Sequence, residues 1–541
     1  MALYLAFMRN PPFPSIRRRT ALAGVFGLSL FALAACASFT GGGAPATPRE
    51  VLSAGLRGID TVYVREVSLR EVTLAGLSRL SQLDSAITVS FAGDVGTLER
   101  DNVEVRSFPL PAEHEPRSWA MLAADVVGAA KGVSPALAQA NNEAIYEVMF
   151  DGFVSKLDRF SRYTSQKETI DVRASREGFG GVGIRVAVEE QRVRILSVQH
   201  YTPAERAGLR ADDSITHIDG KPIAGMEQES IVGLLRGEEG SPVTVTILRG
   251  VEPPFNRTLT RAHITPETVT YEQRGDIAYI RLYGFNTETA ESLERELIQA
   301  KQDLGDGLHG IILDLRNNPG GVLDQSVAVA DLFIQSGRIV STHGRNPDSH
   351  QYYDATPGDI LDGKPIVVLV NGDSASASEI VAAALQDDDR AVVVGSNSYG
   401  KGTVQRVIAL PNNGEMSVTW ARFHAPSGYT LHELGVLPSI CTSEAAANAD
   451  KILRLLQQGR IAALPTAARN ATNPDDTAAL NKLRANCPSQ HGESAIDLEV
   501  ASQLLESPTL YSRAIDLAHV TGPANENLSA VFADQEPALQ P

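Results

Sequence analysis

A run of three serines lies between an apolar segment and a helical pattern, and it could supply a nucleophile. The run from Ser374 to Ile380 reads SASASEI and follows the apolar segment Pro365 to Val370. In open α/β sheets, ligands bind at the carboxyl ends of the strands. A serine just before a helix has free N–H groups and the positive end of the helix dipole, as an oxyanion requires. Simple N-capping by Ser376 or Ser378 fits the same composition, so both interpretations stay open.

A lysine between two glycines is the candidate base. The stretch Gly395 to Lys401 matches most of a P-loop, but Gly402 stands where the Mg²⁺-binding Ser or Thr belongs. The sequence has neither a G-x-S-x-G elbow nor an H-E-x-x-H motif, and no histidine is spaced to serve a serine. A buried neutral lysine is the alternative base for a serine. A solvated loop lysine is the other interpretation of Lys401.

Two glycine-rich segments lead to different expectations. Asn317 to Gly321 (NNPGG) exposes N–H groups that could hold an oxyanion, although a plain turn explains it equally. Gly178 to Gly183 fits a dinucleotide fingerprint, but the alternating run Ile184 to Val188 follows it where a helix is needed. We therefore reject a nucleotide site there.

The elements that must position these groups form an α/β pattern between residues 269 and 440. Strands alternate with helices, which predicts parallel crossover units. The expected buried strands are Gly310–Leu313, Pro365–Val370 and Ala391–Val394, and the expected helices are Ala290–Lys301, Asp324–Gln335 and Ser378–Gln386.

Two further regions flank this core in the sequence. Between Gly178 and Gly250 the pattern is β-rich, with expected strands and helices at Val193–Val198, Pro203–Leu209, Met226–Arg236 and Val243–Leu248. Near the C-terminus, one amphipathic helix is expected from Leu498 to Leu517.

The N-terminus has the features of an export signal. Three arginines, Arg17 to Arg19, precede the apolar run Ala21 to Ala35, which is too short for a membrane span and suits a signal peptide. Small residues directly before Cys36 resemble the lipobox of bacterial lipoproteins, in which the cysteine is lipidated. An ordinary signal peptide with a chance cysteine is the alternative.

The composition of the chain excludes several classes of protein and of binding site. With 43% hydrophobic and 21% charged residues among 541, the chain is neither wholly disordered nor a multi-span membrane protein. Its formal charge of −17 argues against nucleic-acid binding. Three cysteines are too few for a four-cysteine zinc site. In an oxidising compartment we expect Cys441 and Cys487 to pair, with two buried thiols as the alternative.

Together, these residues resemble the C-terminal processing (tail-specific) serine peptidases. The matching segments are Leu315–Gly321, Ser374–Ile380, Ala384–Asp387 and Gly400–Gln405, in the family's order. The resemblance implies that Ser376 is the nucleophile, that Lys401 is the base, and that Gln405 orients the lysine. It also implies an oxyanion hole made of the Ala377 N–H and of Gly320 or Gly321. Asp387 matches a family position that we interpret as structural support.

The β-rich region resembles the PDZ domain embedded in this family. Its carboxylate-binding loop corresponds to Gly181, Val182, Gly183 and Ile184. Backbone N–H groups of such a loop capture a free C-terminus, and strand addition holds the tail. Arg236 could couple this groove to the protease body, although a solvent-exposed surface arginine explains it too. The family does not usually require a disulfide at Cys441.

The expected fold is therefore mixed α/β and multidomain: a tail-specific protease core with an inserted β-rich PDZ domain and a helical N-terminal region. The expected segments are a lipoprotein signal peptide (1–35), a tether (36–48), the N-terminal region (49–165), the PDZ domain (170–252), the peptidase core (265–445), a helical C-terminal region (446–521) and a disordered tail (522–541).

The expected function is a periplasmic serine endopeptidase, lipid-anchored to the outer rather than the inner membrane of a Gram-negative bacterium, that cleaves through an acyl-enzyme. Its partners would be polypeptides with apolar free C-termini, without cofactor, metal or nucleic acid. An adaptor protein, suggested by the resemblance alone, and a homo-oligomer are left open. The rivals are a catalytically silent PDZ scaffold that binds tails and a structural envelope lipoprotein, which would explain none of the motifs.

Overall fold

The computed structural model describes residues 46–189, 192–443, 448–461, 469–470, 472–473 and 475–517. The predicted signal peptide, Cys36 and the tail 522–541 lie outside these residues. Within the described ranges, every helix is too short or too polar to cross a lipid bilayer.

The N-terminal region is mainly helical, as predicted, and it also contains a small sheet. Thr47 caps the first helix through a capping box with Glu50, and Pro48 occupies the first helical turn, where its missing N–H costs nothing. Trp119, Phe150 and Phe153 fill the core of the region. The helices are α1 (Pro48–Val62), α2 (Leu69–Ser78), α3 (Pro116–Val133), α4 (Pro135–Gln139) and α5 (Asn142–Val154), and the antiparallel sheet is β1 (Ile87–Ala92), β2 (Val95–Arg100) and β3 (Val103–Pro109).

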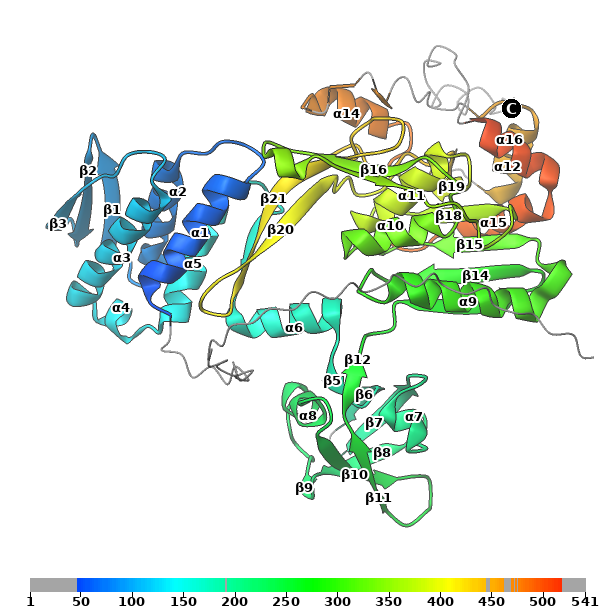
Figure 1. Ribbon diagram of the computed structural model, residues 1–541, viewed down its shortest axis with the longest axis horizontal. Coiled ribbons are helices and arrows are strands. Elements are labelled where there is room, and N and C mark those ends of the chain that lie inside the picture. The colour runs from blue at the N-terminus through cyan, green and yellow to red at the C-terminus, as the bar shows by residue number, and fades with distance from the viewer. Residues whose placement is uncertain are drawn as a thin grey trace, which may run out of the picture. The chain divides into compact units, whose positions relative to one another are not determined.

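The PDZ region has its own sheet and its own hydrophobic core, whose buried members all lie between Val182 and Leu259. Strand β11 pairs with β10, so this sheet extends past the expected boundary at residue 252. Figure 1 shows these elements gathered in one group. They are β5 (Phe179–Gly181), β6 (Ile184–Glu189), β7 (Arg192–Val198), α7 (Pro203–Arg206), β8 (Ser214–Ile218), β9 (Lys221–Pro222), α8 (Gln228–Leu235), β10 (Pro242–Leu248), β11 (Phe255–Thr260) and β12 (Ala262–Ile264).

A six-stranded sheet in the order β13-β14-β15-β18-β19-β22 forms the centre of the peptidase core. Only the β13–β14 pair is antiparallel, and the four remaining pairs are parallel. The three predicted strands are confirmed as β15, β18 and β19. The bounds are β13 (Val269–Arg274), β14 (Ile277–Leu282), β15 (Gly310–Asp314), β18 (Ile366–Val370), β19 (Val392–Gly395) and β22 (Ile440–Cys441).

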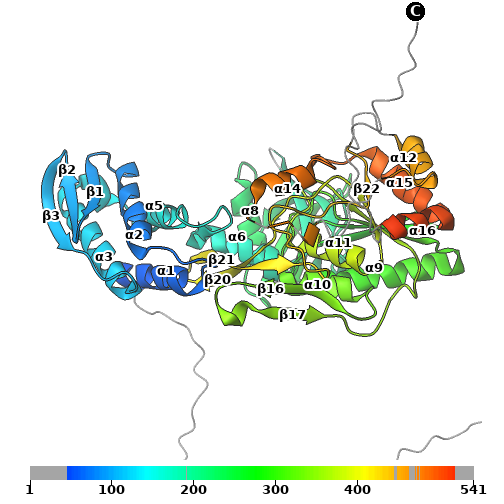
Figure 2. The ribbon, with the colours of Figure 1, turned by 90° about the horizontal axis from the view of Figure 1, so that it is seen from above.

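Helices cover both faces of this sheet, which explains why its strands are continuously apolar. Alternate residues of one strand point to opposite faces: Leu313 packs in one core cluster and Ile312 in another. The first cluster includes α9 (Thr289–Leu304), α10 (Leu323–Asp331) and α11 (Ala377–Asp387), which correspond to the predicted helices. The second cluster includes α12 (Ala449–Gln457), α15 (Ala495–Glu506) and α16 (Pro508–Asp516), which lie together in Figure 2.

The single helix predicted from Leu498 to Leu517 is wrong, because the structure has two helices there. Ser507 is extended, with φ −124° and ψ 96°, and its hydroxyl accepts a hydrogen bond from the Leu510 N–H. Pro508 then begins α16, since proline is tolerated only in the first turn of a helix. The break lets α15 and α16 pack on the same sheet face.

A second sheet joins the N-terminal region to the core. It runs β17-β16-β21-β20, and β4 (Arg162–Thr164) also pairs with β21. Met416 and Val418 of β21 belong to the hydrophobic core of the N-terminal helices. The β20–β21 hairpin therefore has one end in that core, while its other end carries Thr403 and Gln405. The remaining strands are β16 (Arg338–His343), β17 (Gln351–Asp354), β20 (Thr403–Ala409) and β21 (Glu415–His424).

Candidate active site

Three loops meet at the carboxyl edge of the central sheet. They follow β15, β18 and β19, which are neighbouring parallel strands, so their ends lie side by side. The first loop carries Gly320 and Gly321, the second Ser376 and the third Lys401. The topology thus brings the candidate nucleophile, base and oxyanion donors to the edge where α/β folds bind ligands.

The structure separates the roles of the three serines. The Ser374 hydroxyl donates to the Leu315 carbonyl at 2.8 Å, and the Ser378 hydroxyl donates to the Asn318 carbonyl at 2.9 Å. Both are wholly buried. Ser376, by contrast, lines the main cleft. Its φ of 57° is unusual for a residue with a side chain and costs on the order of 1–3 kcal/mol, a kind of strain that clusters at functional sites.

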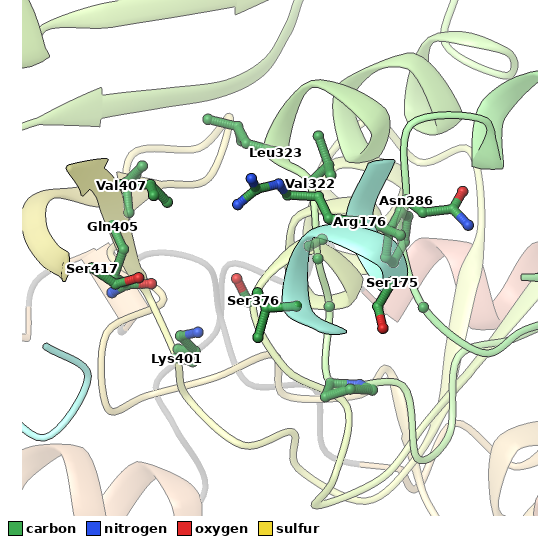
Figure 3. Close-up of a pocket in the computed structure, with 18 of the residues that line it drawn as sticks. Ser175, Arg176, Asn286, Val322, Leu323, Ser376, Lys401, Gln405, Val407 and Ser417 are labelled. Atoms are coloured by element: carbon green, nitrogen blue, oxygen red, sulfur yellow. The ribbon is translucent and has the colours of Figure 1, made fainter. Parts of the chain in front are cut away.

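Lys401 lines the same cleft (Figure 3), and its side chain is half-buried. Burial lowers the pKa of the Lys401 ammonium below its ordinary value, and the positive charge of Arg162 lowers this pKa further. Asp158 and Glu379 oppose the shift. A lysine in this setting loses its proton more readily and can act as a base. Lys401 is followed by β20, whereas a P-loop lysine is followed by a helix.

Glu379 is a fully buried carboxylate that ties the serine and lysine loops together, and the sequence interpretation missed it. Its Oε1 accepts from the Ser398 hydroxyl at 2.5 Å and from the Gly400 N–H at 2.6 Å. Its Oε2 accepts from the N–H groups of Ser376 at 2.7 Å and Lys401 at 2.9 Å. Burial raises the pKa of the Glu379 carboxyl, while these four donors oppose the rise. The position three residues after Ser376 was the available signal, since it is the capping-box position of α11.

The predicted oxyanion donors lie next to Ser376. A Cβ atom on Gly320 would stand 2.9 Å from the Ala377 nitrogen, which shows how closely the two loops approach. The Gly320 N–H already donates to Asn318 Oδ1 at 2.9 Å. The N–H groups of Ala377 and Gly321 have no hydrogen-bond partner among the described residues. Of the two glycines, Gly321 is therefore the one whose N–H is free within the described residues.

Of two further predicted residues, Gln405 lies differently from expectation, whereas Asp387 makes the kind of structural contact that was expected. The Gln405 amide donates to the hydroxyls of Thr403 and Thr419, at 2.9 and 3.3 Å, and within the described ranges it makes no hydrogen bond to Lys401. It nevertheless lines the cleft beside the lysine (Figure 3). Asp387 lies at the far end of α11 from Ser376. Its Oδ2 accepts from the Ser427 N–H and hydroxyl, which is a structural contact.

The cleft around these groups has a volume of about 790 Å³ and could hold an extended peptide segment. Much of its lining is apolar, and several polar side chains of α6 (Gln166–Glu177) form part of one wall. The apolar lining includes Val322, Leu323, Ile380, Val404, Val407 and Phe423.

The PDZ region offers a second place for a peptide. Strand β6 is the edge of its sheet, so its outer side has no partner strand among the described residues and is available for strand addition. The predicted carboxylate loop, Gly181 to Ile184, leads into this strand, and Gly183 adopts φ +82°. Arg236 is not a free surface arginine, because it pairs with Asp171 of α6 at 3.2 Å and lies over the Phe179 ring. Since Asp171 also lines the main cleft, Arg236 connects the PDZ helix to a wall of that cleft.

Several known proteins that resemble this chain are named as proteases. Residues 276–442 match peptidase family S41, and residues 180–254 match the PDZ domain. The carboxy-terminal-processing protease of Bartonella bacilliformis is 42% identical over 308 residues, which are 56% of this chain and 71% of that protein. The chain belongs to the carboxy-terminal-processing proteases of family S41.

More distant relatives also carry protease names. A protein of Staphylococcus aureus named "Probable CtpA-like serine protease" is 33% identical over 305 residues, 56% of this chain and 60% of that protein. The solved photosystem II D1 C-terminal processing protease is 25% identical, with a TM-score of 0.37 over 73% of this chain and 92% of its own. Family membership makes this S41 protease a serine-type peptidase with an inserted PDZ domain.

Proposed function

We propose that this S41 protease is a periplasmic endopeptidase that binds the free C-terminal tail of exported polypeptides and cleaves them with a Ser376–Lys401 dyad. One observation carries the proposal. Ser376 alone of the three serines lines the cleft, at the start of α11, and it shares the cleft with a lysine of lowered pKa.

The proposed reaction is acyl transfer through an ester on Ser376. Neutral Lys401 accepts the Ser376 hydroxyl proton as Oγ attacks a peptide carbonyl. The N–H groups of Ala377 and Gly321 stabilise the negative oxygen that forms. The resulting Lys401 ammonium protonates the leaving amine, and the neutral lysine then activates the water that hydrolyses the ester.

Substrate recognition is assigned to the PDZ groove. The loop Gly181 to Ile184 would receive the terminal carboxylate, and the tail would pair with β6 opposite α8. An apolar cleft and an acidic chain both favour tails with few acidic residues. In the Bartonella protein, carboxy-terminal processing is part of the name, and we extend that activity to this chain.

We also propose that the mature protein begins at a lipidated Cys36 and is anchored to the outer membrane. The apolar run before Cys36 supports export, and the Cys441–Cys487 disulfide of the structure fits an oxidising compartment. In cell fractionation, the native protein should sediment with membranes and Cys36→Ser should not. Equal sedimentation of both forms would contradict the anchor.

The decisive experiment measures cleavage of an unstructured reporter that ends in a free apolar tail. Native mature protein should cleave it, and Ser376→Ala and Lys401→Ala should each lose at least about 10³-fold in kcat. The same reporter with an amidated C-terminus should be cleaved poorly. Activity retained by Ser376→Ala would refute the assigned nucleophile.

The rival function is a catalytically silent scaffold that binds tails through its PDZ domain. Tight binding of the free tail without cleavage by any form would favour it. Reaction of Ser376 with a fluorophosphonate probe separates the two, because only an activated serine reacts rapidly.

A further inference from the structure

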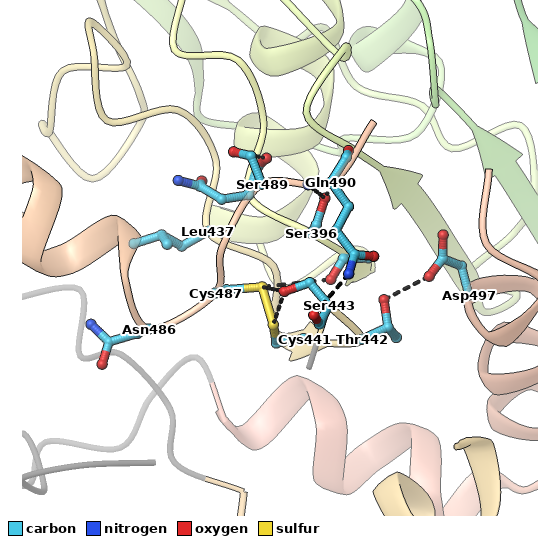
Figure 4. The surroundings of a disulfide bond; sticks show 12 residues. Ser396, Leu437, Cys441, Thr442, Ser443, Asn486, Cys487, Ser489, Gln490 and Asp497 are labelled. Carbon is cyan, nitrogen blue, oxygen red and sulfur yellow. Dashed lines mark hydrogen bonds between the residues drawn. A yellow bond between two sulfur atoms is a disulfide. The ribbon is translucent and has the colours of Figure 1, made fainter. Parts of the chain in front are cut away.

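One segment of the C-terminal region contacts all three loops of the candidate active site. The segment from Arg484 to Glu493, here called the brace segment, connects α14 (Thr477–Arg484) to α15. The disulfide between Cys441 and Cys487 joins it to β22 (Figure 4). It lies far from the catalytic motifs in sequence, and none of the roles assigned so far uses it.

The brace segment holds three consecutive residues of the lysine loop. The Gln490 N–H donates to Ser396 Oγ at 3.0 Å, and the Ser489 hydroxyl donates to the Asn397 carbonyl at 2.8 Å. The Arg484 guanidinium donates to the Ser398 carbonyl at 3.1 Å. These contacts fix the loop three residues before Lys401.

The same segment also reaches the serine and glycine loops. The Gly372 N–H donates to the Gln490 carbonyl at 2.7 Å, and Asn371 Nδ2 donates to the Gly492 carbonyl at 2.6 Å. A Cβ atom on Gly372 would stand 2.9 Å from the Gln490 oxygen, so this approach requires glycine. Asn317, which begins the glycine-rich segment, donates to Glu493 Oε1 at 3.3 Å.

The disulfide fixes the brace segment at the point where the lysine loop begins. Cys441 pairs in β22 with Gly395, the last residue of β19 before that loop. Cys487 is only 3% exposed and belongs to the main hydrophobic core. Gln490 adds a second link near the end of β22, since its side-chain amide donates at 2.8 Å to the carbonyl of Ser443, two residues after that strand.

We propose that the disulfide-held brace segment positions the loops of Ser376, Lys401 and Gly321, and that Arg484 is a positioning residue. Full activity then requires the Cys441–Cys487 bond. The expected loss of activity rests on the proposed function, in which Ser376 and Lys401 cleave a peptide bond. Half of these contacts are to backbone atoms of the loops, and the other half are to the side chains of Ser396, Asn371 and Asn317. The segment therefore sets where the loops lie, and among the described residues it makes no hydrogen bond to the side chains of Ser376 and Lys401. Displacements of about 1 Å at such loops are enough to lower a rate a hundred-fold.

The test compares Cys441→Ser/Cys487→Ser and Arg484→Gln with the native protein and with Arg513→Gln. Arg513 is a matched control, because it also donates to a backbone carbonyl of the C-terminal region, that of Gln457, and within the described ranges it makes no hydrogen bond to an active-site loop. At a temperature where circular dichroism shows every form folded, the first two variants should lose roughly ten- to a hundred-fold in kcat. KM and tail binding to the PDZ domain should be unchanged. Arg484→Lys should recover part of the loss.

Hydrogen exchange supplies a readout that needs no activity. Residues 371–376 and 396–401 should exchange faster in the two variants than in the native protein and in Arg513→Gln. Folded variants with native kcat and native exchange would overturn the proposal, and so would a variant that lowers only the unfolding temperature. If the native protein neither cleaves the reporter nor reacts with a fluorophosphonate, the proposed function fails. The exchange comparison still decides the positioning role by itself. If the cysteine variant fails to fold, Arg484→Gln decides it.

Discussion

At the scale of single residues, the Glu379 carboxylate is the side chain whose replacement should be most damaging outside the cleft. Four donors surround it, three of them backbone N–H groups of the serine and lysine loops. In Glu379→Gln, the amide NH₂ would face donors, and at least one buried N–H would lose its acceptor, which costs roughly 1–3 kcal/mol. We expect a lower unfolding temperature and a kcat loss of about 10²-fold or more.

The matched control for this prediction is Glu294→Gln, since Glu294 is exposed on α9. It should leave kcat and the unfolding temperature unchanged. Native kcat in Glu379→Gln would show that the loops hold their positions without the carboxylate.

The protonation of Lys401 should set the acid limb of the pH–rate profile. Because a neutral lysine is the proposed base, kcat should rise with pH through the lowered pKa. Arg162→Gln removes a positive charge that lowers this pKa, so the limb should move to higher pH. The control Arg57→Gln, on the exposed side of α1, changes the net charge equally and should not move it. An unmoved limb in Arg162→Gln would contradict the electrostatic role.

The same lowered pKa has a consequence for stability. The unfolded chain binds the Lys401 proton more tightly than the folded chain does, so stability rises with pH between the folded pKa and the ordinary value. Lys401→Met should remove this slope in a series of thermal unfolding curves. A slope that stays the same would mean that the pKa of Lys401 is not lowered in the folded state.

Residue types and spacing marked the serine run, Lys401 and the glycine loop as candidates, because these groups sit in local motifs, but the choice of Ser376 among the serines came from the family resemblance. They could not assign the partners of Glu379 or the approach of Gln490 to Gly372. Those contacts join positions that are far apart in the chain, and a buried hydrogen bond leaves no periodic signature in sequence. Gln405 shows the opposite case: the family resemblance implies that it orients Lys401, but its amide donates to the hydroxyls of Thr403 and Thr419 instead.

At the scale of elements, the loop between β15 and α10 depends on a glycine at position 320. A Cβ atom there would stand 2.6 Å from the Ala375 carbonyl, and the backbone has φ +94°. Gly320→Ala should therefore displace the serine loop and lower kcat by about 10²-fold or more. Gly337→Ala is the control, since Gly337 has φ +104° and open space around its Cβ position. It shares the backbone strain, roughly 1–2 kcal/mol, without the clash. Equal losses of kcat in both variants would mean that backbone strain, and not the clash at position 320, lowers the activity.

Helices α6 and α8 meet through an ion pair that should transmit tail binding. The pair of Arg236 with Asp171 is partly exposed and contributes at most about 1 kcal/mol to stability. Arg236→Gln should leave the unfolding temperature nearly unchanged but reduce the preference for a free over an amidated tail. Arg192→Gln breaks a pair within the PDZ domain, with Glu189, and should preserve the preference. If both variants lost the preference for a free tail, damage to the PDZ fold, and not the loss of the contact with α6, would be its cause.

Strands and helices with a regular hydrophobic pattern were predictable from the sequence. Elements whose ends depend on a local interruption of that pattern were not. The strands β15, β18 and β19 are apolar throughout and bounded by turns, so their positions followed from composition. The α15–α16 pair has one continuous helical period, and only the cap at Ser507 divides it. The β20–β21 hairpin was missed because its residues serve two cores, which disturbs simple alternation.

At the scale of the whole molecule, the distribution of hydrophobic cores predicts how the chain unfolds. The N-terminal core includes Met416 and Val418 of β21, so this region and the peptidase core share an element. The PDZ core uses no residue outside its own range. Calorimetry should show one joint transition for the first two and a separate one for the PDZ domain. A fragment of residues 179–264 should fold alone, whereas residues 46–164 should not. A fully folded N-terminal fragment would contradict the shared core.

The antiparallel pairing of β5 with β12 brings together the two points where the chain enters and leaves the PDZ domain. Paired strands lie about 4.8 Å apart, so the chain enters and leaves the insertion at one narrow neck, and the Arg236–Asp171 pair adds a side-chain contact to α6. Such a junction tolerates replacement of everything beyond it, provided that the new ends have the same spacing. The protease could therefore be given a new set of targets by exchanging one compact module at this neck, with its catalytic loops left untouched.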